Sequence, residues 1–361
     1  MFNTNTIFKL FWRHKMNNEP IQEHQKNKQL TSSELADLFA NYMGGSMLCC
    51  VFEHFLQVVE DEEVKNYIEF AITLSRKHLE QMESIFNLEN IPIPVGFGEQ
   101  DVRKNGPRLF SDIFMIFYIT QMAGAAVITY GHAYTNATRQ DIMDYFRNNI
   151  DDAAETYEKG IHLLLLKGVD ISHPTIPYPK KVDFVEKKSF ISIFTGRDRP
   201  LTANEIKHYH YNIITNILGK SLMIGFSQVA SSEKLREYFQ EGAKLASKQI
   251  KIYTDRLINQ DLPSPKLMDT HITDSTASPF SDKLLMYHVS LAGNMALANI
   301  GNALSEILRH DLAAEYIALI PTIGKYNNDG LNIMIEQGWL EEPYTAADRK
   351  KLSEHSSGNQ A

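Results

Sequence analysis

The amino-acid sequence predicts an all-α protein built from two tandem ferritin-like four-helix bundles, each with a long crossover loop between its second and third helices. Three observations predict this fold. Apolar residues recur at intervals of three and four over long stretches, which is helical spacing. The connections between these stretches alternate between very short and very long. The whole pattern occurs twice, so we expect both halves to fold in the same way.

The duplication is visible as residue identities at a fixed separation. In the first part of each copy the separation is 171 residues, and from Phe110 and Phe280 onwards it is 170 residues. The pairs include Leu30/Leu201, Thr31/Thr202, Glu34/Glu205, Tyr67/Tyr238, Gly160/Gly330 and Gly168/Gly338. The one-residue change falls in a predicted loop, where a deletion disturbs a fold least. A site that the fold requires should recur in both copies.

The first two helices of copy one are expected at residues 31–60 and 62–88. Thr31 and Glu34 have the spacing of a capping box at the start of the first helix. Its apolar stripe consists of Leu38, Tyr42, Gly45, Cys49, Phe52, Leu56 and Val59. The connection to the second helix is so short that the two helices must form an antiparallel hairpin.

A loop at residues 89–110 separates this hairpin from a second one, formed by helices at 111–138 and 139–167. Gly168 suits the end of the last helix, because glycine readily adopts the left-handed conformation found there. A helix of about 27 residues is about 40 Å long. A loop of about 22 residues reaches about 70 Å when extended, so it can travel the length of a bundle. This crossover is typical of ferritin-like bundles.

The second copy repeats the plan, with helices expected at 202–230, 233–259, 281–310 and 311–337. The chain then divides into an N-terminal tail (1–29), a first bundle (30–168), a partly packed connecting segment (169–200), a second bundle (201–345) and a disordered tail (346–361). Prolines at the start of the connecting segment favour extended backbone. Its later apolar residues are expected to pack on a bundle: Phe184, Val185, Phe190, Ile191, Ile193 and Phe194.

The charge and cysteine content of the chain exclude some classes of function. The net charge of −8 gives no electrostatic support for a nucleic-acid partner. The two cysteines, Cys49 and Cys50, are adjacent and cannot form a disulfide framework, which fits a cytoplasmic protein. Residues 8–15 are basic and aromatic, but their apolar run is too short for a signal peptide. We expect a frayed tail there.

The third helix of each copy is uncharged over most of its length. Residues 113–138 and 284–305 contain no Asp, Glu, Lys or Arg. Such stretches could span a bilayer, but buried amides and histidines interrupt both and are costly in lipid. A helix that is apolar around most of its circumference is buried on most sides. We therefore expect the helices at 111–138 and 281–310 to form the interface between the bundles or a homo-oligomer contact, with no membrane partner.

Candidate metal ligands occur in copy one only. Ferritin-like bundles hold two metals with carboxylates and Glu-x-x-His motifs, but neither the second nor the fourth helix of copy one contains that motif. Glu158 and His162 share a face of the fourth helix, and Glu53 is expected near the same level. Their counterparts in copy two are Asn328, Asn332 and either Ile224 or Met223. We expect no cofactor, and an iron or manganese site at these three residues is the alternative.

Two motifs carry a resemblance. Lys167-Gly168-Val169-Asp170 is followed by Pro177-Tyr178-Pro179-Lys180, Val182-Asp183-Phe184-Val185 and Arg199-Pro200-Leu201, and copy two closes with Gly338-Trp339-Leu340-Glu341-Glu342-Pro343. Together they resemble a family of uncharacterised duplicated-bundle proteins from spore-forming Bacillus relatives. The resemblance covers about residues 30–345. It implies two ferritin-like bundles, no established activity and no catalytic residues to carry over.

These inferences favour a non-enzymatic cytoplasmic structural or binding protein, linked to sporulation or stress. The alternative is a diiron or dimanganese ferritin-like oxidoreductase with its metal site in the first bundle only. A third hypothesis is a small apolar ligand held between the bundles.

Overall fold

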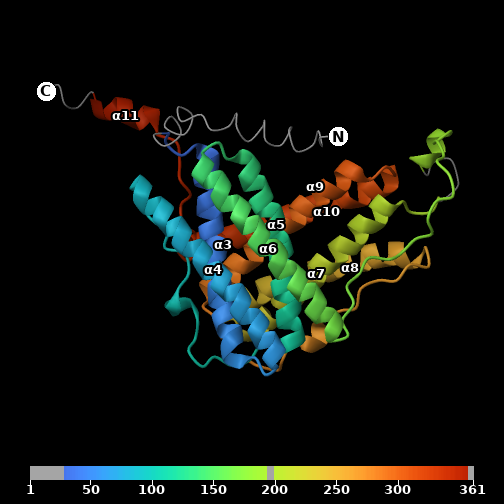
Figure 1. Ribbon diagram of the computed structural model, residues 1–361, viewed down its shortest axis with the longest axis horizontal. Coiled ribbons are helices and arrows are strands. Elements are labelled where there is room, and N and C mark those ends of the chain that lie inside the picture. The colour runs from blue at the N-terminus through green and yellow to red at the C-terminus, as the bar shows by residue number, and fades with distance from the viewer. Residues whose placement is uncertain (1–27, 193–198, 357–361) are drawn as a thin grey trace, which may run out of the picture.

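The structure is a computed structural model that describes residues 28–192 and 199–356. These residues form nine α-helices and no β-strand, which confirms the all-α class. The first repeat contains α3 (Ser32–Val58), α4 (Glu62–Glu89), α5 (Asp112–Asn136) and α6 (Gln140–Leu166). The second contains α7 (Ala203–Val229), α8 (Glu233–Ile258), α9 (Asp282–Glu306) and α10 (His310–Glu336), and α11 (Arg349–Ser356) follows (Figure 1). The ferritin-like class of the repeats stays a prediction.

The predicted capping box is present in both repeats. Thr31 Oγ1 accepts the Glu34 N–H at 3.2 Å, and the Glu34 carboxylate accepts the Thr31 N–H at 2.7 Å. The same carboxylate also accepts N–H groups of Thr138 and Arg139 at the start of α6. Burial alone would raise the pKa of Glu34, but these N–H donors lower it to about 2. The cap therefore also ties α3 to the second hairpin.

Each repeat pairs its helices as two antiparallel hairpins, α3 with α4 and α5 with α6 in the first, α7 with α8 and α9 with α10 in the second. The same interhelical bond recurs in both cores. Tyr67 donates to the carbonyl of Thr156 at 2.9 Å, and its counterpart Tyr238 donates to the carbonyl of Tyr326 at 3.3 Å. A Cβ atom at Gly160 would lie 2.4 Å from Tyr67 Oη, so this close approach requires glycine.

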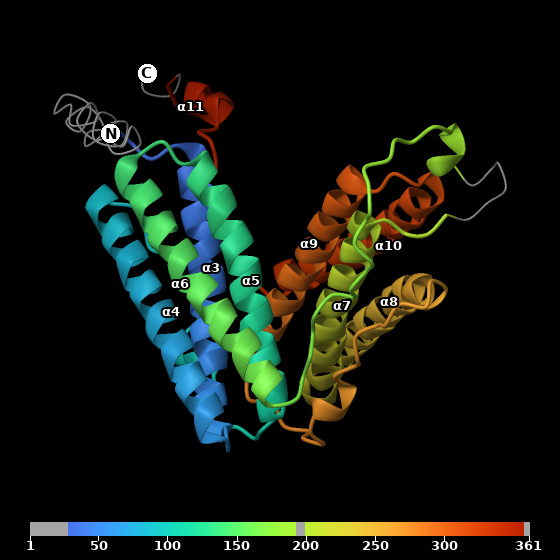
Figure 2. The ribbon, with the colours of Figure 1, turned by 45° about the vertical axis from the view of Figure 1, so that its right-hand side comes forward.

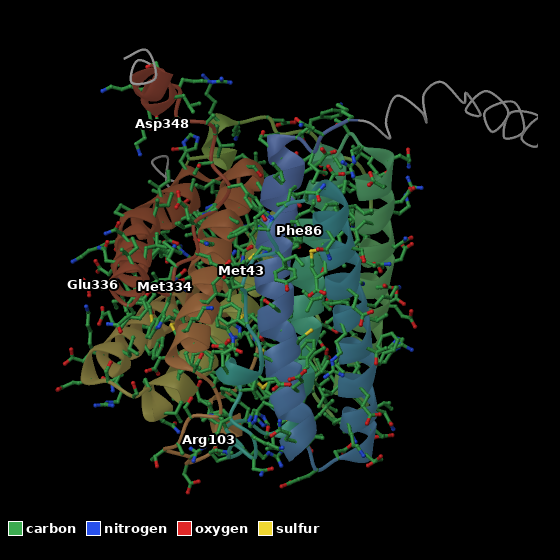
Figure 3. The ribbon with its side chains drawn as sticks, turned by 90° about the vertical axis from the view of Figure 1, so that its left-hand side faces the viewer. Met43, Phe86, Arg103, Met334, Glu336 and Asp348 are labelled. Atoms are coloured by element: carbon green, nitrogen blue, oxygen red, sulfur yellow. The ribbon has the colours of Figure 1, made fainter. Side chains whose placement is uncertain are left out.

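The two crossover loops, which follow α4 and α8, pair with each other. Val102 forms an antiparallel bridge with Phe280, and Phe110 forms one with Ile272. Since Val102 corresponds to Ile272 and Phe110 to Phe280, each bridge is the counterpart of the other. Arg103, labelled at the bottom of Figure 3, lies where the two loops pair. Its backbone N–H donates to the carbonyl of Pro279 at 2.7 Å. The repeats are thus joined by a local two-fold relation.

The segments that follow α6 and α10 each cross to the other repeat. After α6, the ring of His173 lies on that of His210 in α7, with centroids 4.1 Å apart. After α10, the ring of Tyr344 meets that of Phe39 in α3 at 5.5 Å. Phe39 and His210 are equivalent positions, 171 residues apart, whereas Tyr344 lies one position beyond the counterpart of His173. Glu341, in the closing motif that follows α10, makes a further contact with the first repeat.

The carboxylate of Glu341 accepts the N–H groups of Val95 and Gly96 in the first crossover loop, at 3.0 and 2.8 Å. Gly96 has φ +57°, a left-handed conformation that favours glycine. The motif Gly338–Pro343 therefore acts as an arm that fastens the end of repeat two onto repeat one.

The connecting segment and the tail differ from expectation in part. Phe184 and Val185 were expected to pack but are exposed, because residues 174–187 form no helix and are exposed over nearly their whole length. Phe190 and Ile191 are half-buried as expected, and the Phe190 ring carries the Arg199 guanidinium at 4.2 Å. The two remaining apolar positions, Ile193 and Phe194, lie outside the described residues. The segment predicted as a disordered tail contains α11, whose first N–H groups are capped by Asp348.

The predicted ends of the long helices agree closely with the structure except at α9. This helix ends at Glu306, four residues before the predicted end, because the backbone becomes extended at Ile307 and α10 begins at His310. By length and composition alone, α3 and α5 could each cross a membrane, and 56% and 44% of their apolar windows are buried inside the protein. Core helices of globular proteins meet the same criterion.

Candidate functional site

The structure does not bring the three predicted metal ligands together. Glu53 on α3 forms an ion pair with Arg76 on α4, with 2.7 Å between the guanidinium and the carboxylate. Glu158 and His162 are exposed on α6. Residues 28–192 and 199–356 contain no group of three or more His, Cys, Asp or Glu side chains that could hold a metal ion. The iron or manganese alternative stays a prediction.

The two cysteines are buried in α3 and unbonded to each other. Burial raises the pKa of both Cys49 and Cys50 to about 12, so the nucleophilic thiolate is strongly disfavoured near neutral pH. The Cys50 thiol lies 3.5 Å from the carbonyl of Gly98, to which it donates. Both thiols therefore have the properties of structural rather than reactive cysteines.

The main candidate site is a cavity of 290 Å³ between the repeats, lined by residues of α3, α5 and α7 to α10. In Figure 2 the repeats meet at one end, near the crossover loops, and diverge towards the other. Tyr118 on α5 and His288 on α9 meet where they are close, with Tyr118 Oη 3.1 Å from His288 Nε2. The lining residues of α5 all follow Tyr118 in sequence, and those of α9 begin at His288, so the cavity lies on the open side of this contact.

Small residues create this space. The lining includes Gly44 and Gly45 on α3, Ala125 and Ala126 on α5, and Gly219 on α7. A Cβ atom at Gly44 would meet no atom within 4 Å, so this position opens directly into free volume. Larger apolar side chains of the lining include Met47, Leu48, Met122, Leu218, Leu222, Met223 and Val289.

Among the described residues, no Asp, Glu, Lys or Arg lines the cavity. His288 is its only imidazole, and burial lowers the pKa of His288 to about 4, so the ring is neutral at pH 7. A pocket without charge gives an ion nothing to offset the loss of hydration. The cavity therefore suits uncharged molecules.

Together with His288, three amide side chains form the most buried polar part of the lining. Asn216 on α7, Gln249 on α8 and Asn299 on α9 are 8%, 5% and 4% exposed, and all three belong to the second repeat. The polar residues that line the cavity from the first repeat are half-buried or exposed: Asn41, Gln121, Thr129 and Tyr130. The cavity thus has a deeply buried polar side and a largely apolar remainder.

The sequence predicted the helices that surround this cavity but not the role of its amides. The uncharged, small-residue third helices predicted an interface, and the structure places α5 and α9 in contact through Tyr118 and His288 within one chain. A homo-oligomer contact through the same helices stays a prediction. Asn216 gave no signal, because an amide on an otherwise apolar helix is equally typical of a satisfied core group.

A second hollow of 540 Å³ lies between α5, α6, α7 and residues 169–173. Its lining includes Glu158, one of the three predicted metal ligands, together with Asp170 and His173. Gln121 and Tyr211 line both hollows, so the two adjoin. The uncharged lining distinguishes the first cavity from this one.

The comparisons with known proteins place the chain as follows. A family model described as protein of unknown function (DUF3231) matches residues 20–182 and again residues 189–352. No curated protein matches the chain. A crystal structure of a putative spore coat protein from Bacillus halodurans is similar to it, at 19% sequence identity and a TM-score of 0.37. That match covers 44% of this chain and 99% of the other.

Proposed function

Because the chain belongs to the DUF3231 family, whose function is unknown, we propose from its geometry that it is a non-enzymatic binding protein that holds a small, largely apolar molecule between its repeats. The observation that carries the proposal is the 290 Å³ cavity with an uncharged lining. Its size is close to the lower end of ligand pockets, about 300 Å³. The lining contributes wide apolar contact together with a few convergent polar groups, as ligand pockets do.

The chemistry of the lining favours binding over catalysis. The described residues of the lining include no carboxylate, lysine, arginine or thiol, which serve enzymes, besides histidine, as acids, bases and nucleophiles. The neutral His288 ring already bonds Tyr118 through Nε2. These groups can orient a molecule and exclude water from it.

We also propose a bundle class, a location and an oligomeric contact for the protein. Two hairpins joined by a full-length crossover support a ferritin-like four-helix bundle in each repeat. The proposed cytoplasmic location rests on the two adjacent cysteines, and the proposed link to spores rests on the resemblance of the sequence motifs. A homo-oligomer would have to use surface that the internal contact of α5 and α9 leaves free.

An apolar fluorescent dye tests the proposed function with the full chain. We expect the dye to bind and its fluorescence to increase, and we expect Gly44→Leu to abolish this signal by filling the cavity. Gly131→Leu is a matched control, because a Cβ at Gly131 also meets no atom within 4 Å but Gly131 does not line the cavity. Equal dye binding by the wild-type chain and Gly44→Leu would contradict the proposal, provided that both give the same unfolding midpoint.

A further inference from the structure

The buried amides of the cavity have unused hydrogen-bonding capacity. Asn216 donates to the carbonyl of Asn212 at 2.8 Å, and Asn299 donates to Thr215 Oγ1 at 3.4 Å. The carbonyl oxygens of both amides accept no hydrogen bond from the described residues. Each amide is thus fixed through its nitrogen and has its oxygen free.

Gln249 goes further, because its side chain makes no hydrogen bond to any described residue although the residue is only 5% exposed. It lines the cavity from α8, beside Ala246 and Leu245. A buried amide without a partner costs free energy, and buried polar groups in proteins are nearly always paired with protein, water or ligand. The Gln249 amide opens onto the cavity, so it can both donate to and accept from a molecule held there.

The duplication supplies a comparison inside the molecule. The positions equivalent to Asn216, Gln249 and Asn299 are Gly45, His78 and Thr129. Gly45 has no side chain, Thr129 is exposed, and His78 bonds Asp152 at 2.9 Å. The fold can thus be built without amides at these positions, so the second repeat carries them for a reason other than the shared fold.

We propose that the occupant is an uncharged amphiphile, with an apolar body and one terminal hydroxyl that Gln249 and one of the two asparagines, Asn216 or Asn299, bind. A long-chain primary alcohol has this chemistry. Its hydroxyl can donate to an Asn carbonyl and accept from the Gln249 amide, whereas its alkyl chain lies against Leu218, Leu222 and the small residues of α3 and α5. A carboxylate or ammonium end would be excluded by desolvation. This inference rests on the proposed function.

The test compares three probes of equal chain length on the full-length protein: decanol, decane and decanoate, each competing with the apolar dye. We expect decanol to displace the dye at about tenfold lower concentration than decane, as one or two net hydrogen bonds allow. Decanoate should be weaker than both at neutral pH. In Gln249→Leu we expect decane binding to persist and the preference for decanol to disappear. Gln240→Leu, at an exposed position of the same helix, should leave the preference intact.

The outcomes separate the two proposals. Equal affinity for decanol and decane in the wild-type chain, or an unchanged preference in Gln249→Leu, would overturn recognition by the amides and leave the binding function standing. Tightest binding of decanoate would overturn the uncharged ligand. Failure of all probes and of the dye, with no effect of Gly44→Leu, would overturn the binding function itself.

Discussion

Tyr118 and His288 occupy equivalent positions in the two repeats, and their side chains meet, with Tyr118 Oη 3.1 Å from His288 Nε2. Both side chains are buried. A residue that contacts its own counterpart lies on a local two-fold axis, as in the isologous interface of a homodimer. The reciprocal pairing of the crossover loops obeys the same relation. The duplicated chain is therefore a dimer-like assembly within one polypeptide, and its cavity lies beside the axis.

Tyr118→Phe should destabilise the chain. The substitution leaves the buried Nε2 of His288 without its partner, and Nδ1 of the same ring already has none among the described residues. We expect the free energy of unfolding to fall by about 1–3 kcal/mol, measured by urea unfolding at neutral pH. Tyr134→Phe removes a hydroxyl that bonds the exposed Arg147 and should change it by less than about 0.5 kcal/mol. Equal losses would show that the Tyr118 bond contributes nothing special.

Stability should decrease as the pH falls below neutrality. Burial lowers the pKa of His54 and of His288 to about 4, whereas histidine in an unfolded chain titrates near about 6.5. Between these values the unfolded chain binds more protons, so acid favours unfolding. Each histidine can remove up to about 3 kcal/mol as the pH drops from about 6.5 to about 4.

Urea unfolding at a series of pH values measures this slope. His54→Gln should flatten it, because the variant has one buried titrating group fewer, and a slope identical to that of the wild-type chain would refute the assignment to His54.

Gly160→Ala should be destabilising even though alanine favours helices. The added Cβ would lie 2.1 Å from Thr120 Oγ1 and 2.4 Å from Tyr67 Oη, so the α4–α6 contact must shift. We expect a loss of about 1–3 kcal/mol by urea unfolding. Gly131→Ala is the opposite case, since nothing lies within 4 Å of its Cβ. That variant should gain up to about 1 kcal/mol, and a loss at both positions would count against the packing described.

Glu341→Ala should loosen the contact between the end of repeat two and the first crossover loop. The carboxylate accepts the N–H groups of Val95 and Gly96, so both amides lose their acceptor. Hydrogen–deuterium exchange should become faster at these two amides and remain unchanged in α8. Glu342→Ala, at the neighbouring position, provides the control. Unchanged exchange at Val95 and Gly96 would mean that the arm is not held by Glu341.

Local patterns predicted most of the fold. The capping residues Thr31 and Thr202 and the alternating loop lengths gave the helices and hairpins, because these features act over a few residues. The duplication then extended each inference to the other half. Pairing of Val102 with Phe280 joins residues far apart in sequence, and no local pattern encodes it. Phe184 was placed wrongly for a related reason, since an apolar residue has no intrinsic partner until the surrounding helices are arranged.

The candidate site was predicted only in outline. The uncharged third helices indicated buried contact between the repeats, and a small apolar ligand there was one of three hypotheses. The role of Gln249 depends on whether a hydrogen-bond partner reaches it from a neighbouring helix, which sequence spacing cannot decide. The hypothesis for Glu53, Glu158 and His162 assumed that residues at one level point to one axis, whereas Glu53 turns to Arg76.

Native mass spectrometry of the full-length chain in the presence of decanol tests the central claim most directly, because it counts molecules held per chain. The account predicts a complex of one chain with one decanol for the wild-type protein and for Gly131→Leu, and free chain alone for Gly44→Leu. Free chain alone for the wild-type protein, or the same complex for Gly44→Leu, would contradict the claim that the repeats hold an apolar molecule between them.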